Sequence, residues 1–260
     1  MREIVIDDSE PLVSIVVPAY NAQKFIAGTL DSLCKQLFQD IEIIVVNDGS
    51  TDDTEKVIKN FFFDRRIRYF KKDNGGTGSA LNLGHENARG RYVNWCSADN
   101  IYFPNFILEL VQAMQQCELN DLPVQFIYSD FTYIDASGRR LRDVVHERPQ
   151  PRGDLINGYD LGMSFLYTKE LWDKAGPYWE RICEDYDWAV RAAQFTEFGL
   201  VKRILAAFRV HSNQITGSDR TEEDAAAEAC RQAARAFIEQ GKYEALVKKE
   251  TEFRPVLVED

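Results

Sequence analysis

Two polar loops near the start of the chain have the position and composition of a nucleotide site. Each follows an apolar run of strand length, at 13–17 and 41–46. In open α/β sheets, ligands bind where strand ends and the following helix N-termini converge, and helix N-termini attract phosphate groups. We therefore expect these loops to contact a nucleotide. The residues of the first loop are Pro18, Ala19, Tyr20 and Asn21.

Three later stretches carry the side chains that would turn such a pocket into a reaction. Oxygen-donating side chains bind hard divalent cations, and a positioned carboxylate can remove a proton from a hydroxyl. The acidic pair Glu184 and Asp185 opens a predicted helix, where the helix dipole favours ionised carboxylates. His211 follows a predicted strand, a place where histidine is also a common surface or packing residue. The remaining stretch is Ser97, Ala98, Asp99 and Asn100.

The elements that must position these residues follow a β/α alternation through the first half of the chain. Such alternation favours a mostly parallel sheet with helices on both faces. The predicted strands there are 13–17, 42–46, 67–70 and 92–96, and the predicted helices are 22–38, one after 50, 78–87 and 104–116. In the second half we expect strands at 124–128, 162–167 and 200–210, a turn at 135–138 between two strands within 133–142, and a helix at 186–195.

The chain of 260 residues is long enough for one large domain with a short appendage. We expect a catalytic domain over 1–220 and a helical appendage over 221–260, because 222–240 is rich in strong helix formers. The segment 143–159 carries two prolines and few structural signals. Long loops in compact domains are usually functional, so we expect this one to border the acceptor side of the site.

The charge balance excludes a general nucleic-acid binder. The net charge is −11, so the excess of Lys and Arg that phosphate backbones require is missing. The basic run 65–72 alternates apolar with charged residues, which predicts a strand with one solvated face and leaves contact with an anionic lipid or a diphosphate as the alternative.

The cysteines and the absence of long apolar runs indicate a soluble, cytoplasmic protein. Five cysteines, an odd number without a Cys-x-x-Cys pair, are typical of reduced thiols and not of a disulfide framework or a zinc site. No run approaches the roughly 18 apolar residues of a membrane span, and the first residues lack the apolar core of a signal peptide. Peripheral membrane contact stays open, and the oligomeric state is not indicated.

Four stretches, taken in order, resemble the motifs of family 2 glycosyltransferases of the GT-A fold. They are 13–21, 45–52, 74–82 and 88–92, and the resemblance covers about 12–215. It implies an α/β GT-A fold with a Rossmann-like, mostly parallel central sheet flanked by helices and a C-terminal helical tail. It also implies an inverting glycosyltransferase in glycan or polysaccharide biosynthesis, with a nucleotide-sugar donor and a glycan or lipid-linked acceptor.

In the second and third motifs, the resemblance assigns nucleotide contacts to Asp48, Asn74 and Gly75. A carboxylate at Asp48 would accept the imide N–H of uracil or thymine, which cytosine lacks, so a UDP-linked or dTDP-linked donor is favoured. The alternative is that Asp48 only forms an Asx-turn before Gly49. Glycines such as those after Asn74 let backbone approach a ligand closely, although they also form ordinary turns.

The stretch around Asp99 resembles the family's Asp-x-Asp motif, and Asp99 falls on its metal-binding position. Ser97 replaces the first Asp and would contact the ribose, with Ala98 beside the nucleotide. His211 matches an Arg-x-His pattern whose imidazole completes the metal shell. The implied ion is Mn²⁺ or Mg²⁺, which would neutralise the departing diphosphate. The alternatives are that Asp99 caps the following helix and that His211 is a packing residue.

The resemblance makes Asp185 the general base that takes the acceptor proton, with Glu184 as the second catalytic candidate. The alternative is an ordinary acidic helix start. Two aromatic side chains nearby, Trp179 and Trp188, would either form a sugar platform or pack in the core.

Two other functions remain open from the sequence. A catalytically weak nucleotide-sugar-binding protein would explain why Ser97 and Asn47 stand where the family has carboxylates. A sugar nucleotidyltransferase would share the Rossmann-like pattern, but it needs a Gly-rich loop and a basic residue after the first strand, where this chain has 18–21.

Overall fold

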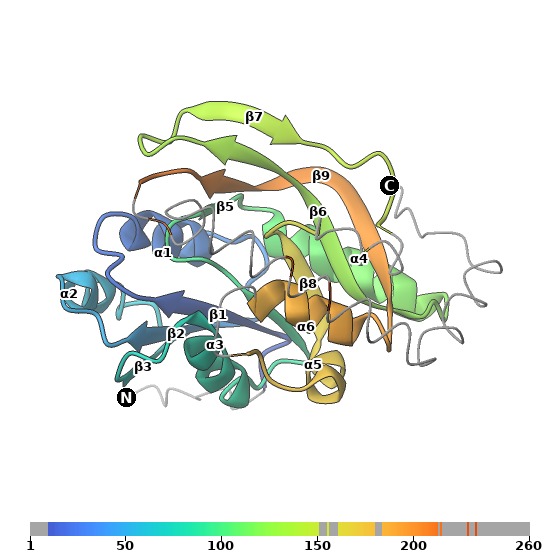
Figure 1. The fold of residues 1–260 in the computed structure, drawn as a ribbon, viewed down its shortest axis with the longest axis horizontal. Coiled ribbons are helices and arrows are strands. Elements are labelled where there is room, and N and C mark those ends of the chain that lie inside the picture. Colours follow the sequence, from blue (N-terminus) through green and yellow to red (C-terminus); the bar gives the residue numbers. More distant parts are fainter. Residues whose placement is uncertain are drawn as a thin grey trace, which may run out of the picture.

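The computed structural model describes residues 10–150, 155, 161–179, 184–212, 214, 228 and 232. In this part of the chain, one curved sheet of nine strands lies between two groups of helices (Figure 1). The strands are β1 (Val13–Ala19), β2 (Ile41–Asp48), β3 (Ile67–Lys72), β4 (Tyr92–Trp95), β5 (Ile101–Tyr102), β6 (Val124–Ile134), β7 (Arg140–Val144), β8 (Phe165–Thr168) and β9 (Glu197–Arg209). The helices are α1 (Ile26–Cys34), α2 (Thr54–Lys59), α3 (Thr77–Glu86), α4 (Phe106–Leu119), α5 (Lys169–Ala175) and α6 (Glu184–Ala192).

The first half of the sheet is parallel, as the alternation predicts. The strand order is β3-β2-β1-β4-β8-β6-β9-β5, and β1 pairs in parallel with both β2 and β4. The register sets Ala19 beside Asn47, and Asp48 beside Lys72. The C-terminal ends of β1, β2 and β3 therefore lie at one edge, and the loops after them adjoin.

Alternate side chains of each strand enter opposite cores, so the sheet needs helices on both faces. Ile15 and Val17 belong to the core beneath α1 and α4, whereas Val16 belongs to the core beneath α3, α5 and α6. Burying a side chain of this kind contributes about 1.5–3 kcal/mol, which makes the two cores the main source of stability. Trp188 of α6 is almost fully buried in the second core.

The second half of the sheet makes it mixed and not purely parallel, although β6 and β9 pair in parallel. β8 pairs antiparallel with β4 and with β6, and β5 pairs antiparallel with β9. Two strands joined by a turn are predicted within 133–142. The structure has the end of β6, a turn that begins at Asp135, and β7. Asp135 accepts the backbone N–H groups of Ser137 and Arg139 there, at 2.9 and 3.0 Å. β5 and α5 are not in the predicted set.

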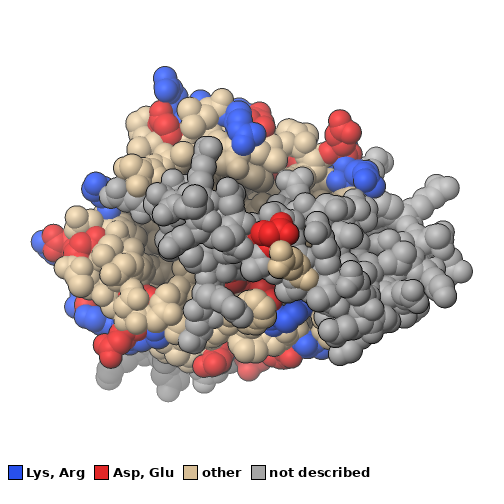
Figure 2. All heavy atoms as spheres, viewed as in Figure 1, with Lys and Arg blue, Asp and Glu red and all other residues tan. Residues whose placement is uncertain are grey.

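Several predictions concern residues that are only partly covered. Of the segment 143–159, which we expect to border the acceptor side, the structure describes residues 143–150 and Leu155. The predicted helix 222–240 lies outside the described residues apart from Glu228 and Gln232. Among the described residues, Cys34, Cys96 and Cys117 are free thiols. None of the described helices combines the length and apolar composition of a membrane span. On the face shown in Figure 2, the described Lys and Arg residues are interspersed with Asp and Glu.

Candidate functional site

The loops after β1 and β2 are joined by hydrogen bonds. The backbone N–H of Asn21 donates to Oγ of Ser50 at 3.0 Å, and the N–H of Thr51 donates to Oδ1 of Asn21 at 2.9 Å. Asn21 has φ +48°, a left-handed conformation that Asn tolerates better than most residues. Tyr20 is half exposed beside it. The structure thus brings together the two polar loops that the sequence predicts to share a pocket.

Asp48 fixes the glycine loop that precedes α3. Its carboxylate accepts the backbone N–H of Gly75 at 3.0 Å, that of Gly76 at 2.8 Å, and the ammonium of Lys72 at 2.7 Å. These contacts differ from the Asx-turn that was the alternative for Asp48, and the neighbouring Asn47 accepts the N–H of Ser50, three residues on, at 3.0 Å through its Oδ1. The Gly75 N–H also lies 3.2 Å from the second Asp48 oxygen, so each oxygen of the carboxylate accepts two contacts.

Gly49 is needed where the β2 loop crosses the glycine loop. Its φ of +73° lies in the left-handed region, and a Cβ there would lie 2.6 Å from the backbone nitrogen of Asn74. A side chain at Gly49 would therefore push apart the loops that contain Asp48 and Asn74. Asn74 and Gly75 are both exposed at this edge.

Asp99 and His211 meet because β5 pairs antiparallel with β9. Ile101 lies opposite Ala207, so the residues just before β5 lie beside those just after β9. His211 Nε2 is 3.1 Å from Asp99 Oδ2, although the two residues are 112 positions apart. Ser97 and Ala98 lead directly from β4 into this turn, and the backbone carbonyl of Ser97 accepts the N–H of Asn100 at 3.4 Å.

Arg209 organises the surroundings of the Asp99–His211 pair. Its Nε donates to the backbone carbonyl of Asp99 at 2.8 Å, and its backbone N–H donates to Oδ1 of the buried Asn100 at 2.9 Å. The ring of Phe25 lies 4.5 Å from the ring of His211 and beneath the Arg209 guanidinium at 5.0 Å. The pair is therefore held on one side by an aromatic ring and a fixed cation.

The donor set at this pair fits a hard divalent cation in part. Adjacent ligands of an octahedral ion at about 2.1 Å are about 3 Å apart, which matches the separation of the Asp99 and His211 atoms. Among the described residues, no group of three His, Cys, Asp or Glu side chains could hold a metal together. Mg²⁺ and similar ions commonly take the rest of their ligands from water and substrate phosphates, so two protein ligands are a sufficient protein contribution.

Glu184 and Asp185 form the first turn of α6 and have perturbed acidities. Burial and the negative charge of Asp185 raise the pKa of Glu184 to about 7. Burial also raises the pKa of Asp185, while the backbone N–H of Tyr186, 2.7 Å from Asp185 Oδ1, acts in the opposite direction. Raised carboxyl pKa values in a partly buried pair are typical of groups that exchange protons near neutral pH. Within the described part of the chain, no direct hydrogen bond or ion pair joins Asp185 to Asp99.

Trp188 is a core residue and not a sugar platform. It is almost fully buried, and its Nε1 donates to the backbone carbonyl of Gly176 at 3.1 Å. Its ring packs 4.6 Å from that of Tyr167 in β8. Trp179 is only partly buried.

Sequence reasoning missed two cations at this edge, Lys72 and Arg209. Both lie in stretches that the sequence singles out, Lys72 at the end of the basic run and Arg209 two residues before His211. The basic run is β3, in which Arg68 pairs with Glu42 at 2.6 Å and Lys71 pairs with Glu55. The register that aligns Lys72 with Asp48 would have identified Lys72, but it is visible only in the structure.

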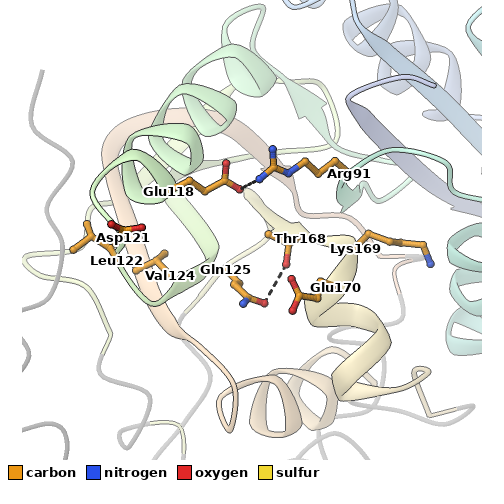
Figure 3. A pocket seen from close by; sticks show the side chains of 9 residues that line it. All are labelled: Arg91, Glu118, Asp121, Leu122, Val124, Gln125, Thr168, Lys169 and Glu170. Atoms are coloured by element: carbon orange, nitrogen blue, oxygen red, sulfur yellow. Dashed lines mark hydrogen bonds and ion pairs between the residues drawn. The ribbon is translucent and has the colours of Figure 1, made fainter. Parts of the chain in front are cut away.

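A cavity of about 480 Å³ lies away from all of these residues, at the opposite end of β4 (Figure 3). Arg91 precedes β4, and its guanidinium pairs with Glu118 at 2.8 Å across the cavity wall. Thr168 donates to Gln125 at 3.2 Å on another side. None of the residues that the sequence predicts for the site lines this cavity.

Comparison with known proteins gives matches over most of the chain. The family model described as "Glycosyl transferase family 2" matches residues 14–174. An uncharacterized glycosyltransferase from Rickettsia felis is 34% identical over 213 residues, which cover 78% of this chain and 35% of that protein. The chain therefore spans about a third of the length of this relative.

Two solved structures have a similar fold. The S. aureus TarS 1-349 structure in complex with UDP-GlcNAc has a TM-score of 0.68 at 18% identity, covering 80% of this chain and 61% of that one. The mannosyltransferase PcManGT from Pyrobaculum calidifontis, in complex with GDP-Man and Mn²⁺, has a TM-score of 0.63 at 16% identity, covering 94% and 74%. At these identities the likeness concerns the fold, and it confirms the predicted GT-A fold.

Proposed function

The chain belongs to glycosyl transferase family 2, and on that premise we propose that it is an inverting enzyme that transfers a sugar from a nucleotide diphosphate donor to a hydroxyl acceptor. The observation that carries the proposal is the Asp99–His211 pair, with 3.1 Å between the two side chains at the sheet edge where the β4 and β9 chains emerge. The acceptor we propose is a glycan or a lipid-linked glycan, as in polysaccharide biosynthesis.

The proposed donor carries UDP or dTDP. The Asp48 carboxylate shares the Gly75 N–H between its two oxygens, at 3.0 and 3.2 Å, and an imide N–H of uracil or thymine would take the place of the longer of these two contacts. The glycine loop would then lie against the nucleotide, with the first-loop residues Tyr20 and Asn21 on its other side. TarS in complex with UDP-GlcNAc supports a uridine donor.

In the proposed reaction, Asp185 takes the proton of the acceptor hydroxyl while the hydroxyl oxygen attacks the anomeric carbon and the bond to the diphosphate breaks. One displacement inverts the configuration at that carbon. Asp99 and His211 would hold Mn²⁺ or Mg²⁺, which supplies positive charge beside the leaving diphosphate. Glu184 keeps a second carboxyl beside the base and, through its charge, tunes proton transfer. PcManGT in complex with Mn²⁺ supports a divalent ion.

The test of the proposed function is a panel of nucleotide sugars, each with Mn²⁺ and with EDTA. We expect UDP-linked or dTDP-linked sugars to raise the melting temperature and to release nucleoside diphosphate only with Mn²⁺, because ligands that bind the native state stabilise it. Binding without metal-dependent release would favour the nucleotide-sugar-binding alternative. Release of pyrophosphate from a nucleoside triphosphate would favour the nucleotidyltransferase alternative.

The acidities of the α6 pair predict the pH dependence of transfer. A raised pKa keeps a carboxyl protonated to a higher pH, and a protonated carboxyl cannot act as a base. With the pKa of Glu184 at about 7 and that of Asp185 raised, kcat/KM should increase as the pH rises from about 6 to about 8.

A Glu184→Gln variant distinguishes the two carboxyls. It removes the carboxyl whose pKa is about 7 and whose pKa the charge of Asp185 helps to raise, so the rise of kcat/KM near pH 7 should disappear and only the rise due to Asp185 itself, at lower pH, should remain. A profile that is flat between about pH 5.5 and 8 in the native enzyme would contradict the assignment of the base to this pair. If the Glu184→Gln variant shows the native dependence of kcat/KM on pH, Glu184 does not contribute to the rise near pH 7.

A further inference from the structure

A buried polar cluster behind α6 joins it to α3 and β8. His85 of α3 is completely buried, and its Nδ1 donates to the carbonyl of Leu81 at 2.7 Å, so its Nε2 accepts the hydroxyl of Tyr167 at 2.5 Å. Tyr167 gives its proton to His85, so it accepts the hydroxyl of Tyr178 at 2.7 Å. Burial lowers the pKa of His85 to about 3, which keeps the ring neutral in this role.

Asn82 binds the backbone of Tyr178 at both ends of its amide. Nδ2 donates to the carbonyl of Tyr178 at 2.9 Å, and Oδ1 accepts the N–H of Tyr178 at 2.8 Å, across 96 positions of sequence. Asn82 is also the last residue of the third sequence motif, which begins with the loop that Asp48 fixes. One amide therefore joins the helix behind the proposed donor loop to the segment 176–179.

The segment 176–179 in turn fixes α6. The ring of Tyr178 stacks on that of Trp188 at 5.4 Å, and Trp188 donates to the carbonyl of Gly176 at 3.1 Å. Arg191 donates to the carbonyl of Pro177 at 2.8 Å while its guanidinium also pairs with Asp187 at 2.7 Å. Trp188 lies three residues after Asp185, so the two residues are on the same side of α6, about one turn apart. Contacts that hold Trp188 therefore also hold the turn that carries Asp185.

We propose that Asn82 is a positioning residue for sugar transfer: its double hydrogen bond to Tyr178 sets the first turn of α6, and with it Asp185, relative to the donor-binding loop before α3. The inference rests on the proposed function. It assigns to Asn82 no contact with substrate. Transfer requires the base, the acceptor and the donor in one geometry, and a displacement of about 1 Å can cost about 100-fold in rate.

The experiment compares Asn82→Ala with Asn87→Ala. Asn87 ends the same helix and donates to the carbonyl of Leu83 at 2.8 Å, so its replacement loses a comparable side-chain bond without touching the segment 176–179. In Asn82→Ala we expect kcat to fall about 10- to 100-fold, with the donor KM and the UDP dissociation constant unchanged. Asn87→Ala should keep the native kcat.

Two further measurements keep the inference testable. Amide hydrogen exchange should become faster in α6 of Asn82→Ala, and not in β1 or β2. If Asn82→Ala does not fold, Asn82→Asp takes its place, because it keeps the size of the side chain and the acceptor for the Tyr178 N–H but loses the donor to the Tyr178 carbonyl. Its kcat should be lower than that of Asn87→Ala.

Equal kcat values in folded Asn82 and Asn87 variants would overturn the inference, as would equal loss of kcat and UDP affinity. A native enzyme without transfer activity would instead count against the proposed function. In that case the amide hydrogen exchange of α6 still reports whether Asn82 holds α6 in place. Unchanged exchange in the Asn82 variants would overturn the inference that it does.

Discussion

Replacing Asp185 with Asn is expected to lower the transfer rate by about two or more orders of magnitude while UDP binds with native affinity. The amide keeps the size of the side chain and can still accept the N–H of Tyr186, but it cannot take a proton from the acceptor. The measurement is steady-state transfer together with UDP titration by calorimetry. Native transfer by Asp185→Asn would remove Asp185 from the role of base.

The matched control for that variant is Asp173→Asn. Asp173 belongs to the neighbouring helix α5, its side chain is 60% exposed, and its ion pair with Lys169 is a surface pair of small energetic weight. It should transfer sugar at the native rate. A comparable loss in Asp173→Asn would mean that the Asp185 result reflects general sensitivity of this region to lost charge.

Replacing Asp99 with Asn is expected to lower transfer by about 100- to 1000-fold at saturating Mn²⁺, the usual loss when one charge-stabilising group is removed from a reaction centre. The variant keeps the backbone carbonyl that accepts Arg209 Nε, so the turn should persist. The exposed Asp40 offers the matched control Asp40→Asn, which should be unaffected.

His211→Ala provides a graded comparison at the same pair. It should raise the Mn²⁺ concentration needed for half-maximal transfer by about 10- to 100-fold, in line with losses seen around metal sites. The readout is a Mn²⁺ titration of transfer at fixed donor. If the titration of His211→Ala coincides with that of the native enzyme, His211 is a packing residue against Phe25.

The parallel half of the fold could be predicted from the sequence because its signals are local. The apolar run 43–46 of β2 and the helical spacing of α1 each identify an element without knowledge of its neighbours. The structure changes only their bounds, as with the helix predicted at 22–38 and observed as Ile26–Cys34.

The second half of the sheet is harder to predict because its strands are defined by their hydrogen-bonded partners and not by local sequence patterns. β5 has two residues, too few for any periodicity, and exists through its antiparallel register on β9. α5 is a seven-residue helix whose start is fixed by the hydroxyl of Thr168, which accepts the N–H of Leu171 at 3.1 Å. β8 lies between β4 and β6 and runs antiparallel to both, and this insertion has no sequence signal.

At the site, side-chain types could be predicted but their partners could not. The motifs predict Asp48, Asp99 and His211 as residues of the candidate site. The partners of Asp48 include two backbone N–H groups, which every residue except proline has, so no pattern distinguishes them. The proximity of Asp99 to His211 depends on strand register, which is a property of the assembled sheet.

The Asp99–His211 contact has a consequence for the order in which the molecule matures during synthesis. Its two members are separated by 112 positions, and the second follows the last strand of the described sheet. A ribosome-bound chain that has emerged only through residue 174, where the family match ends, would already contain every segment of the first two polar loops but neither Asp185 nor His211. The Asp99–His211 contact therefore cannot form until residue 211 has been synthesised, long after the first two polar loops.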